Sequence, residues 1–94
     1  MSAPTVFNAA AEAQLEAANS ALRLLRNNGR RVLATLMTAG RRPLLVLDGP
    51  APLFMRDAAR SGGREQLPDG RWGRRLLLDC GVDVIWAEQA GEAQ

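Results

Sequence analysis

Apolar residues recur near the start of the chain at alternating spacings of four and three, as on one side of an α-helix. These residues are Ala11, Leu15, Ala18, Leu22 and Leu25. The spacing predicts a helix over residues 8–26, with Asn8 as its N-cap and Gly29 as its C-terminal stop. The stripe either lies on the domain's own sheet or forms a seam between two copies of the chain. The residues of such a dimer seam would be Leu15, Ala18, Leu22 and Leu25.

Two short apolar runs near the other end of the chain, Leu76–Leu78 and Val82–Trp86, are separated by three residues that suit a turn. Gly81 can take the positive φ of a tight turn, and Asp79 can accept a hydrogen bond from the turn backbone. The pattern predicts a β-hairpin. Cys80 is then a small, partly buried turn thiol.

Alternation along the last of these runs assigns its side chains to two faces of a sheet. Trp86 shares one face with Val82 and Val84, which predicts core packing for the tryptophan. Ile85 points the other way, and we expect a second subunit to cover that face.

The segments after the first helix are less regular. Pro43 precedes a short buried strand at Leu44–Leu47. Arg31–Thr38 is apolar on both sides, so it is either a strand that is central or faces a second subunit, or a continuation of the helix after a kink at Gly29.

Two further segments lie between residues 53 and 73. Leu53–Arg60 is either a two-turn helix or an irregular segment with Leu53 and Phe54 turned inward. Residues 61–73 are predicted to be a mobile loop with a turn at Pro68-Asp69-Gly70.

Together these elements predict a single α+β domain over residues 8–87, with a long N-terminal helix packed on a small antiparallel sheet of three to four strands. Residues 1–7 are expected to be a flexible N-terminus, and residues 88–94 a polar C-terminal tail. A chain of 94 residues has a modest core, which favours association with another subunit, and we expect a homodimer.

The composition argues against catalysis, because the chain has no histidine, lysine or tyrosine and a single cysteine. The usual acid–base group at neutral pH, a Schiff-base lysine and a cysteine–histidine zinc site are therefore missing. Asp48 and Asp79 each follow an apolar run, where turn-forming aspartates are common. We expect no enzymatic activity, no cofactor and no metal ion.

All twelve basic residues are arginines, and they lie between residues 23 and 75, where they face only four acidic residues. The ends of the chain are acidic, which suits an anion-binding surface in the middle. Trp72 stands among arginines, an arrangement suited to a protein interface or to stacking on a base. The alternative is that the arginine pairs only protect strand edges and maintain solubility. The candidate partner-binding residues are Arg41, Arg42, Arg71, Trp72, Arg74 and Arg75.

No apolar run approaches the length of a transmembrane helix, and no basic start precedes an apolar signal core. The single cysteine suits a reducing compartment. We therefore expect a cytoplasmic protein without a membrane partner.

Three segments carry a resemblance to a known group: Gly40-Arg41-Arg42-Pro43-Leu44-Leu45-Val46-Leu47-Asp48-Gly49-Pro50, Gly73-Arg74-Arg75 and Cys80-Gly81-Val82-Asp83-Val84-Ile85-Trp86. With them the sequence resembles short, arginine-rich open reading frames of phages and prophages in GC-rich bacteria. In that group glycine precedes the cysteine, whereas here Cys80 precedes Gly81. The resemblance covers about half the chain and implies a small accessory protein that acts on a host or phage component.

The sequence thus predicts a phage-type protein-binding module that inhibits or modulates a host protein, such as a defence or nucleic-acid-processing complex. A second hypothesis is a small nucleic-acid-binding regulator, with arginines on phosphates and Trp72 stacked on a base. A third is a phage assembly component.

Overall fold

The structure is a computed structural model that describes residues 9–60, 62–67 and 69–88. The expected N-cap Asn8, the N-terminus 1–7 and all of the expected tail except Glu88 lie outside these ranges. The described elements are the helices α1 (Ala9–Asn27) and α2 (Leu53–Ala58) and the strands β1 (Arg31–Leu36), β2 (Leu44–Asp48), β3 (Arg64–Gln66), β4 (Trp72–Leu77) and β5 (Asp83–Ala87).

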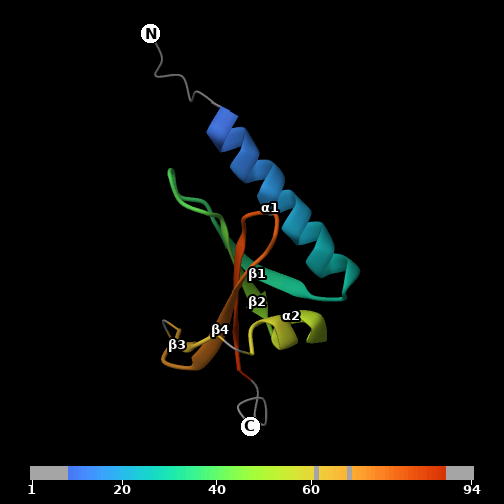
Figure 1. The fold of residues 1–94 in the computed structure, drawn as a ribbon, viewed down its shortest axis with the longest axis vertical. Helices are drawn as coiled ribbons and strands as arrows, with labels where there is room; N and C mark the ends of the chain where they lie inside the picture. The colour runs from blue at the N-terminus through green and yellow to red at the C-terminus, as the bar shows by residue number, and fades with distance from the viewer. Residues whose placement is uncertain (1–8, 61, 68, 89–94) are drawn as a thin grey trace.

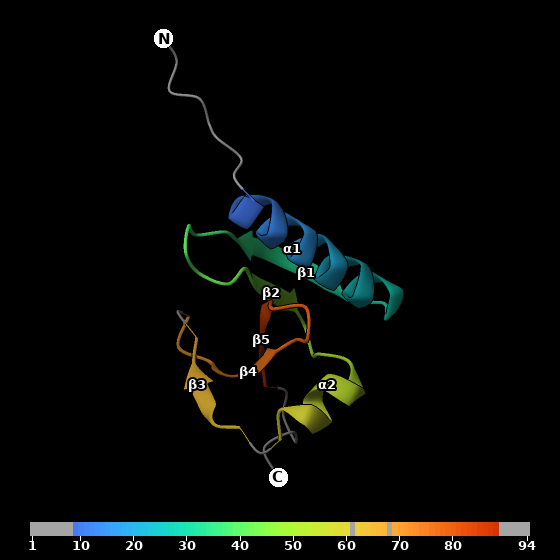
Figure 2. The same ribbon diagram turned by 45° about the horizontal axis from the view of Figure 1, so that its top comes forward.

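The strands form one five-stranded sheet in the order β1-β2-β5-β4-β3. Figures 1 and 2 show β1, accompanied by α1, at one end of this sheet and β3 at the other. The expected α+β class, with a long N-terminal helix on a sheet, is confirmed. The sheet has five strands rather than three to four, and it is mixed because β2 and β5 pair in parallel.

Helix α1 ends in a Schellman motif at the predicted glycine. The amide of Arg30 donates to the carbonyl of Leu25 at 2.9 Å, and the amide of Gly29 donates to the carbonyl of Arg26 at 2.9 Å. Gly29 has a φ of 73°. The chain therefore reverses within three residues and enters β1 directly. Arg31–Leu36 is thus a strand and not a continuation of the helix.

The core lies between the two helices and one face of the sheet. Trp86 is its largest residue, 1% exposed, and shares the cluster with Leu25 of α1 and Met55 of α2. Val82 and Val84 are fully buried beside it, as the alternation in this run predicted. Burial of these apolar side chains supplies most of the driving force for folding.

The stripe on α1 packs on the sheet in a slightly different direction from the predicted one. Ala18, Ala21 and Leu25 are buried in the core, whereas Leu22 is half-buried and Leu15 is 42% exposed. Ala18 and Leu25 are therefore covered within the chain and are not available for a dimer seam.

The predicted hairpin forms, with β4 and β5 antiparallel and Gly81 at a φ of 88° in the turn between them. Two details differ from the predictions. Cys80 is exposed rather than partly buried, because the turn extends beyond the sheet. β1 is an edge strand with most of its residues exposed, so the central alternative is wrong, whereas the alternative that it faces a second subunit stays a prediction.

Between β2 and β4, the first of the two alternatives for Leu53–Arg60 is confirmed, because α2 is a helix. Met55 is its buried side chain, whereas Leu53 and Phe54 are 62% and 50% exposed, so the alternative that turns these two residues inward is wrong. The next segment needs a correction. Residues 61–73, predicted to be a loop, contain β3, which pairs antiparallel with β4. The predicted turn is present, since the amide of Gly70 donates to the carbonyl of Leu67 at 2.9 Å.

Neither described helix combines the length and apolar character that a membrane span requires.

Candidate protein-binding surface

The alternation of side chains along β4 divides the predicted binding residues between the two faces of the sheet. Arg74 lies opposite Trp86 of β5 and so shares the helix-covered face, as does Trp72 two residues earlier. Arg75 lies opposite Ile85 on the other face. The predicted surface is therefore not continuous.

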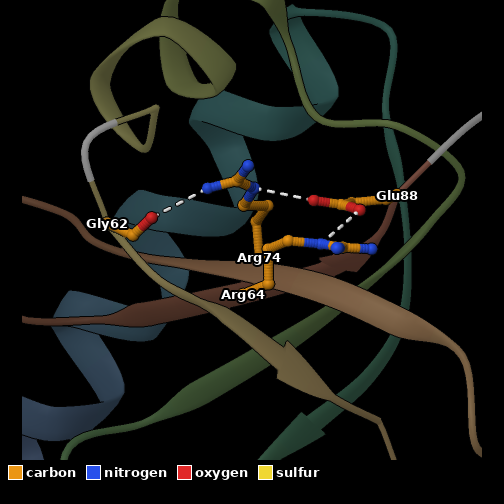
Figure 3. A network of polar contacts seen from close by, with 4 residues as sticks. All are labelled: Gly62, Arg64, Arg74 and Glu88. Carbon is orange, nitrogen blue, oxygen red and sulfur yellow. Dashed lines mark hydrogen bonds and ion pairs between the residues drawn. The ribbon is translucent and has the colours of Figure 1, made fainter. Parts of the chain in front are cut away.

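Arg74 belongs to a network that holds the end of β5 in place (Figure 3). Its Nε donates to Glu88 Oε1 at 2.8 Å and its Nη1 donates to the carbonyl of Gly62 at 2.8 Å. The other carboxylate oxygen of Glu88 accepts from Nε of Arg64 at 2.9 Å. The side chains of Arg74 and Glu88 are only 19% and 6% exposed, so this network stabilises the fold and offers little to a partner.

Trp72 is 49% exposed, yet one face of its ring is already in use. The guanidinium carbon of Arg64 lies 5.0 Å from the centre of the ring, which is cation–π geometry. A base can therefore stack on at most the opposite face of Trp72.

Arg71 pairs locally with Asp69 in the turn before β4. Its Nε donates to Asp69 Oδ2 at 2.6 Å, and its backbone amide donates to Asp69 Oδ1 at 3.0 Å. These two hydrogen bonds, led by the backbone one, hold the pKa of Asp69 below its ordinary value. Arg71 thus stabilises a turn.

Arg75 lies on the face of the sheet away from the helices. Its Nε donates to Glu65 Oε1 at 2.7 Å, and its Nη1 lies 3.6 Å from Asp83 Oδ2. The hydrogen bond to Glu65 raises the pKa of Arg75, partial burial opposes that rise, and the charges of Glu65 and Asp83 add to it.

Arg41 and Arg42 line the same hollow as Arg75. The loop that carries them is held to α1, because Nε2 of Gln14 donates to the backbone carbonyl of Arg41. Neither Arg41 nor Arg42 forms an ion pair with a carboxylate among the described residues. A hollow of about 680 Å³ is lined by Leu36, Thr38, Gly40, Arg41, Arg42, Leu44, Arg75 and Asp83.

This hollow opens onto an apolar sheet face that neither described helix covers. Leu36 and Leu77 on this face are 52% and 46% exposed, and Leu44 and Val46 are half-buried. A second, smaller cluster of buried residues, Leu67, Ile85 and Ala87, lies at its centre. The structure therefore brings three of the six predicted arginine and tryptophan residues together, beside an apolar surface.

The sequence reasoning missed the apolar part of this surface. Leu36 and Leu44 occupy paired positions on β1 and β2, and this pairing could not be inferred without the register. The available signal was that Leu44–Leu47 is apolar at every position, which is typical of a strand with both faces covered.

The described residues contain no group of three or more potential metal-ligating side chains. Comparison of the chain with known protein families, with curated proteins and with solved structures finds no match.

Proposed function

We propose that the protein is a non-enzymatic binding module that docks another protein on the sheet face opposite its helices. The observation that carries the proposal is the apolar face bordered by Arg41, Arg42 and Arg75. Leu36, which is 52% exposed, and its half-buried pair Leu44 present apolar surface beside these arginines, and apolar side chains with a charged rim are typical of a docking site.

The charges define the chemistry of the partner. Arg75 is already held by Glu65 and Asp83, so Arg41 and Arg42 are the arginines at this hollow without a carboxylate partner among the described residues. A partner that fits would present apolar side chains to Leu36 and Leu44 and acidic side chains to the two arginines.

A protein partner fits better than a nucleic acid. Nucleic-acid binding gains affinity from several arginine–phosphate contacts along one path, with aromatic rings free to stack. Here Arg74 and Arg75 are engaged by carboxylates and lie on opposite faces of the sheet, and Trp72 is covered on one side by Arg64, which leaves too few groups along any one path.

The resemblance to phage-type proteins implies a small accessory protein that acts on a host or phage component, and the role that we propose in this context is inhibition or modulation of a host protein. Docking alone suffices for this role, since occupation of a partner's surface needs no catalytic group. A phage assembly component would use the same face for a phage protein.

The docking proposal is tested by selecting binders from a displayed library of random peptides and measuring their affinity by fluorescence anisotropy. We expect enriched peptides that combine apolar and acidic residues. Arg41→Glu with Arg42→Glu should weaken them about tenfold or more, because two attractive contacts become repulsive. Arg23→Glu is the matched control, since Arg23 is exposed on α1 and its expected effect is small.

Enriched peptides whose affinity does not depend on Arg41 and Arg42 would contradict the proposal. Retention of duplex DNA or single-stranded RNA near physiological salt, with a steep salt dependence, would favour the nucleic-acid hypothesis instead. A partner found through the selected peptides is then assayed with and without the protein. An unchanged partner activity would refute inhibition but not docking.

A further inference from the structure

Helix α1 carries a second stripe beside the one buried on the sheet. Its members follow each other at spacings of three and four, the heptad spacing of helix-to-helix seams. They are Glu12, Leu15, Asn19, Leu22 and Arg26. Leu22 is half-buried and the other four are exposed, so this stripe lies along the flank of the helix rather than beneath it.

The second stripe is complementary to itself when two copies of α1 run antiparallel. About the midpoint at Asn19, Leu15 of one helix faces Leu22 of the partner subunit, and Glu12 faces Arg26 of the partner subunit. Neither Glu12 nor Arg26 forms an ion pair among the described residues. Each two-fold related contact occurs twice, so the arrangement gains two leucine pairs and two opposite-charge pairs.

The adjacent edge of β1 is also without a partner. β1 pairs with β2 on one side, and no other described strand pairs with its outer side. Leu33 on this strand is 61% exposed. An exposed apolar edge is a ready template for another strand. A groove of about 490 Å³ separates this edge from the flank of α1, lined by Leu22, Arg26, Arg30, Arg31, Val32, Leu33, Ala34 and Thr35.

A single two-fold axis can relate both α1 and β1 to their counterparts in a second copy. Arg26 lies near the start of β1 because of the tight turn after α1, and Gln14 reaches the carbonyl of Thr38 just past the end of β1. The middle of α1, at Asn19, therefore lies alongside the middle of β1. Figure 2 shows the two elements running side by side at the same edge of the sheet.

We propose that the protein is a two-fold dimer in which α1 packs antiparallel against α1 of a second copy and β1 pairs with β1 of that copy. The two sheets then join into one. The occupant is a second copy rather than another protein because the stripe carries both charges in mirrored positions. This interface lies at the β1 edge and α1 flank, and it does not depend on the proposed docking at Arg41 and Arg42.

The test uses the full chain and measures its mass by light scattering and sedimentation over chain concentrations from about 1 to 500 μM. We expect a mass of twice 10.1 kDa for the natural sequence. Glu12→Arg and Arg26→Glu, each made alone, should weaken the dimer about tenfold or more, because each turns two attractive pairs into repulsive ones.

Mixing the two variants gives a sharper readout. A Glu12→Arg chain has arginine at both ends of the stripe, and an Arg26→Glu chain has glutamate at both ends. An equimolar mixture should therefore form a heterodimer at chain concentrations at which each variant alone is monomeric. Arg42→Glu is the matched control and should leave the dimer unchanged. Circular dichroism confirms that each variant is folded.

Disulfide trapping tests the axis itself. In a Cys80→Ser background, Asn19→Cys should form an intersubunit disulfide under mild oxidation. Residue 19 lies at the midpoint of the antiparallel pairing, so it faces residue 19 of the second copy. Ala13→Cys, on a different side of the same helix, should not. A chain that stays monomeric throughout would overturn the proposal. A dimer unaffected by both charge reversals, or trapped equally through Ala13→Cys, would also overturn it.

Discussion

Leu67 packs directly over Gly73, on the sheet face that neither described helix covers. A Cβ atom at Gly73 would lie 3.0 Å from Leu67 Cδ2 and 2.5 Å from the backbone carbonyl oxygen of Trp86. The glycine therefore has two consequences. It leaves room for Leu67 to pack against Ile85 and Ala87 in the small apolar cluster, and it lets β4 approach β5 closely.

Gly73→Ala should destabilise the fold by about 2 kcal/mol or more, because the methyl group has to displace backbone as well as a side chain. Urea denaturation followed by tryptophan fluorescence measures the change. The double variant with Leu67→Ala should not recover the loss, since the clash with the Trp86 carbonyl remains. Full recovery in the double variant would show that only Leu67 restricts this position.

Leu25 and Leu15 belong to the same predicted stripe but occupy different environments. Leu25→Ala should cost about 2–5 kcal/mol of unfolding free energy, since the side chain is fully buried in the core. Leu15→Ala should change the unfolding free energy of dilute chain by less than about 0.5 kcal/mol, because its side chain is 42% exposed. Equal losses in the two variants would mean that the helix packs as the sequence alone suggested.

These two residues show how far the sequence predicted the fold. The 3.6-residue period identified the helix and its glycine stop, and alternation identified the hairpin and the buried Trp86. A period alone does not separate neighbouring stripes on a helix rich in alanine, so it predicts one stripe that contains both Leu15 and Leu25. Which stripe is buried depends on the shape of the sheet, which the local pattern does not contain.

The candidate site was harder to predict for a related reason. Arg74 and Arg75 are adjacent in the sequence but lie on opposite faces, because β4 is a regular strand over both. The prediction that both belong to one surface is therefore wrong, because side chains alternate between the faces of a strand. Arg74 is also unavailable to a partner because it forms an ion pair with Glu88. The sequence predicts a polar tail at Glu88, and only the tertiary structure brings these two residues together.

Glu88→Gln tests whether this network stabilises the fold. The change leaves the partly buried Arg74 without its counter-charge, and we expect a loss of about 2 kcal/mol in urea denaturation. Arg64→Ala is the comparison. Arg64 is 43% exposed, so its ion pair with Glu88 should contribute less than about 1 kcal/mol. A larger loss for Arg64→Ala than for Glu88→Gln would contradict this ranking.

The turn before β4 should respond to pH through Asp69. Hydrogen bonds from Arg71 lower the pKa of this carboxyl in the folded protein, so its charged form stabilises the turn. The contribution is present above the ordinary pKa of 3.8 and is lost as the pH falls through the lower folded value. Titration of the carboxyl carbon by NMR should give a pKa below 3.8.

Arg71→Ala separates the two sources of this shift. It removes the side-chain hydrogen bond and the charge but keeps the backbone amide, so the pKa of Asp69 should rise only part of the way toward its ordinary value. A full return would mean that the backbone hydrogen bond contributes nothing. An unchanged value would mean that the guanidinium contributes nothing.

Cys80 should react with a thiol reagent in the folded protein at nearly the rate measured in urea. Its side chain is exposed in the turn between β4 and β5, so modification needs no opening of the structure. Val82→Cys in a Cys80→Ser background is the matched control, two residues away and fully buried. Its reaction should wait for transient opening and be slower by orders of magnitude. Slow reaction at Cys80 would show that this turn is covered in solution, by a partner or by a part of the chain outside the described ranges.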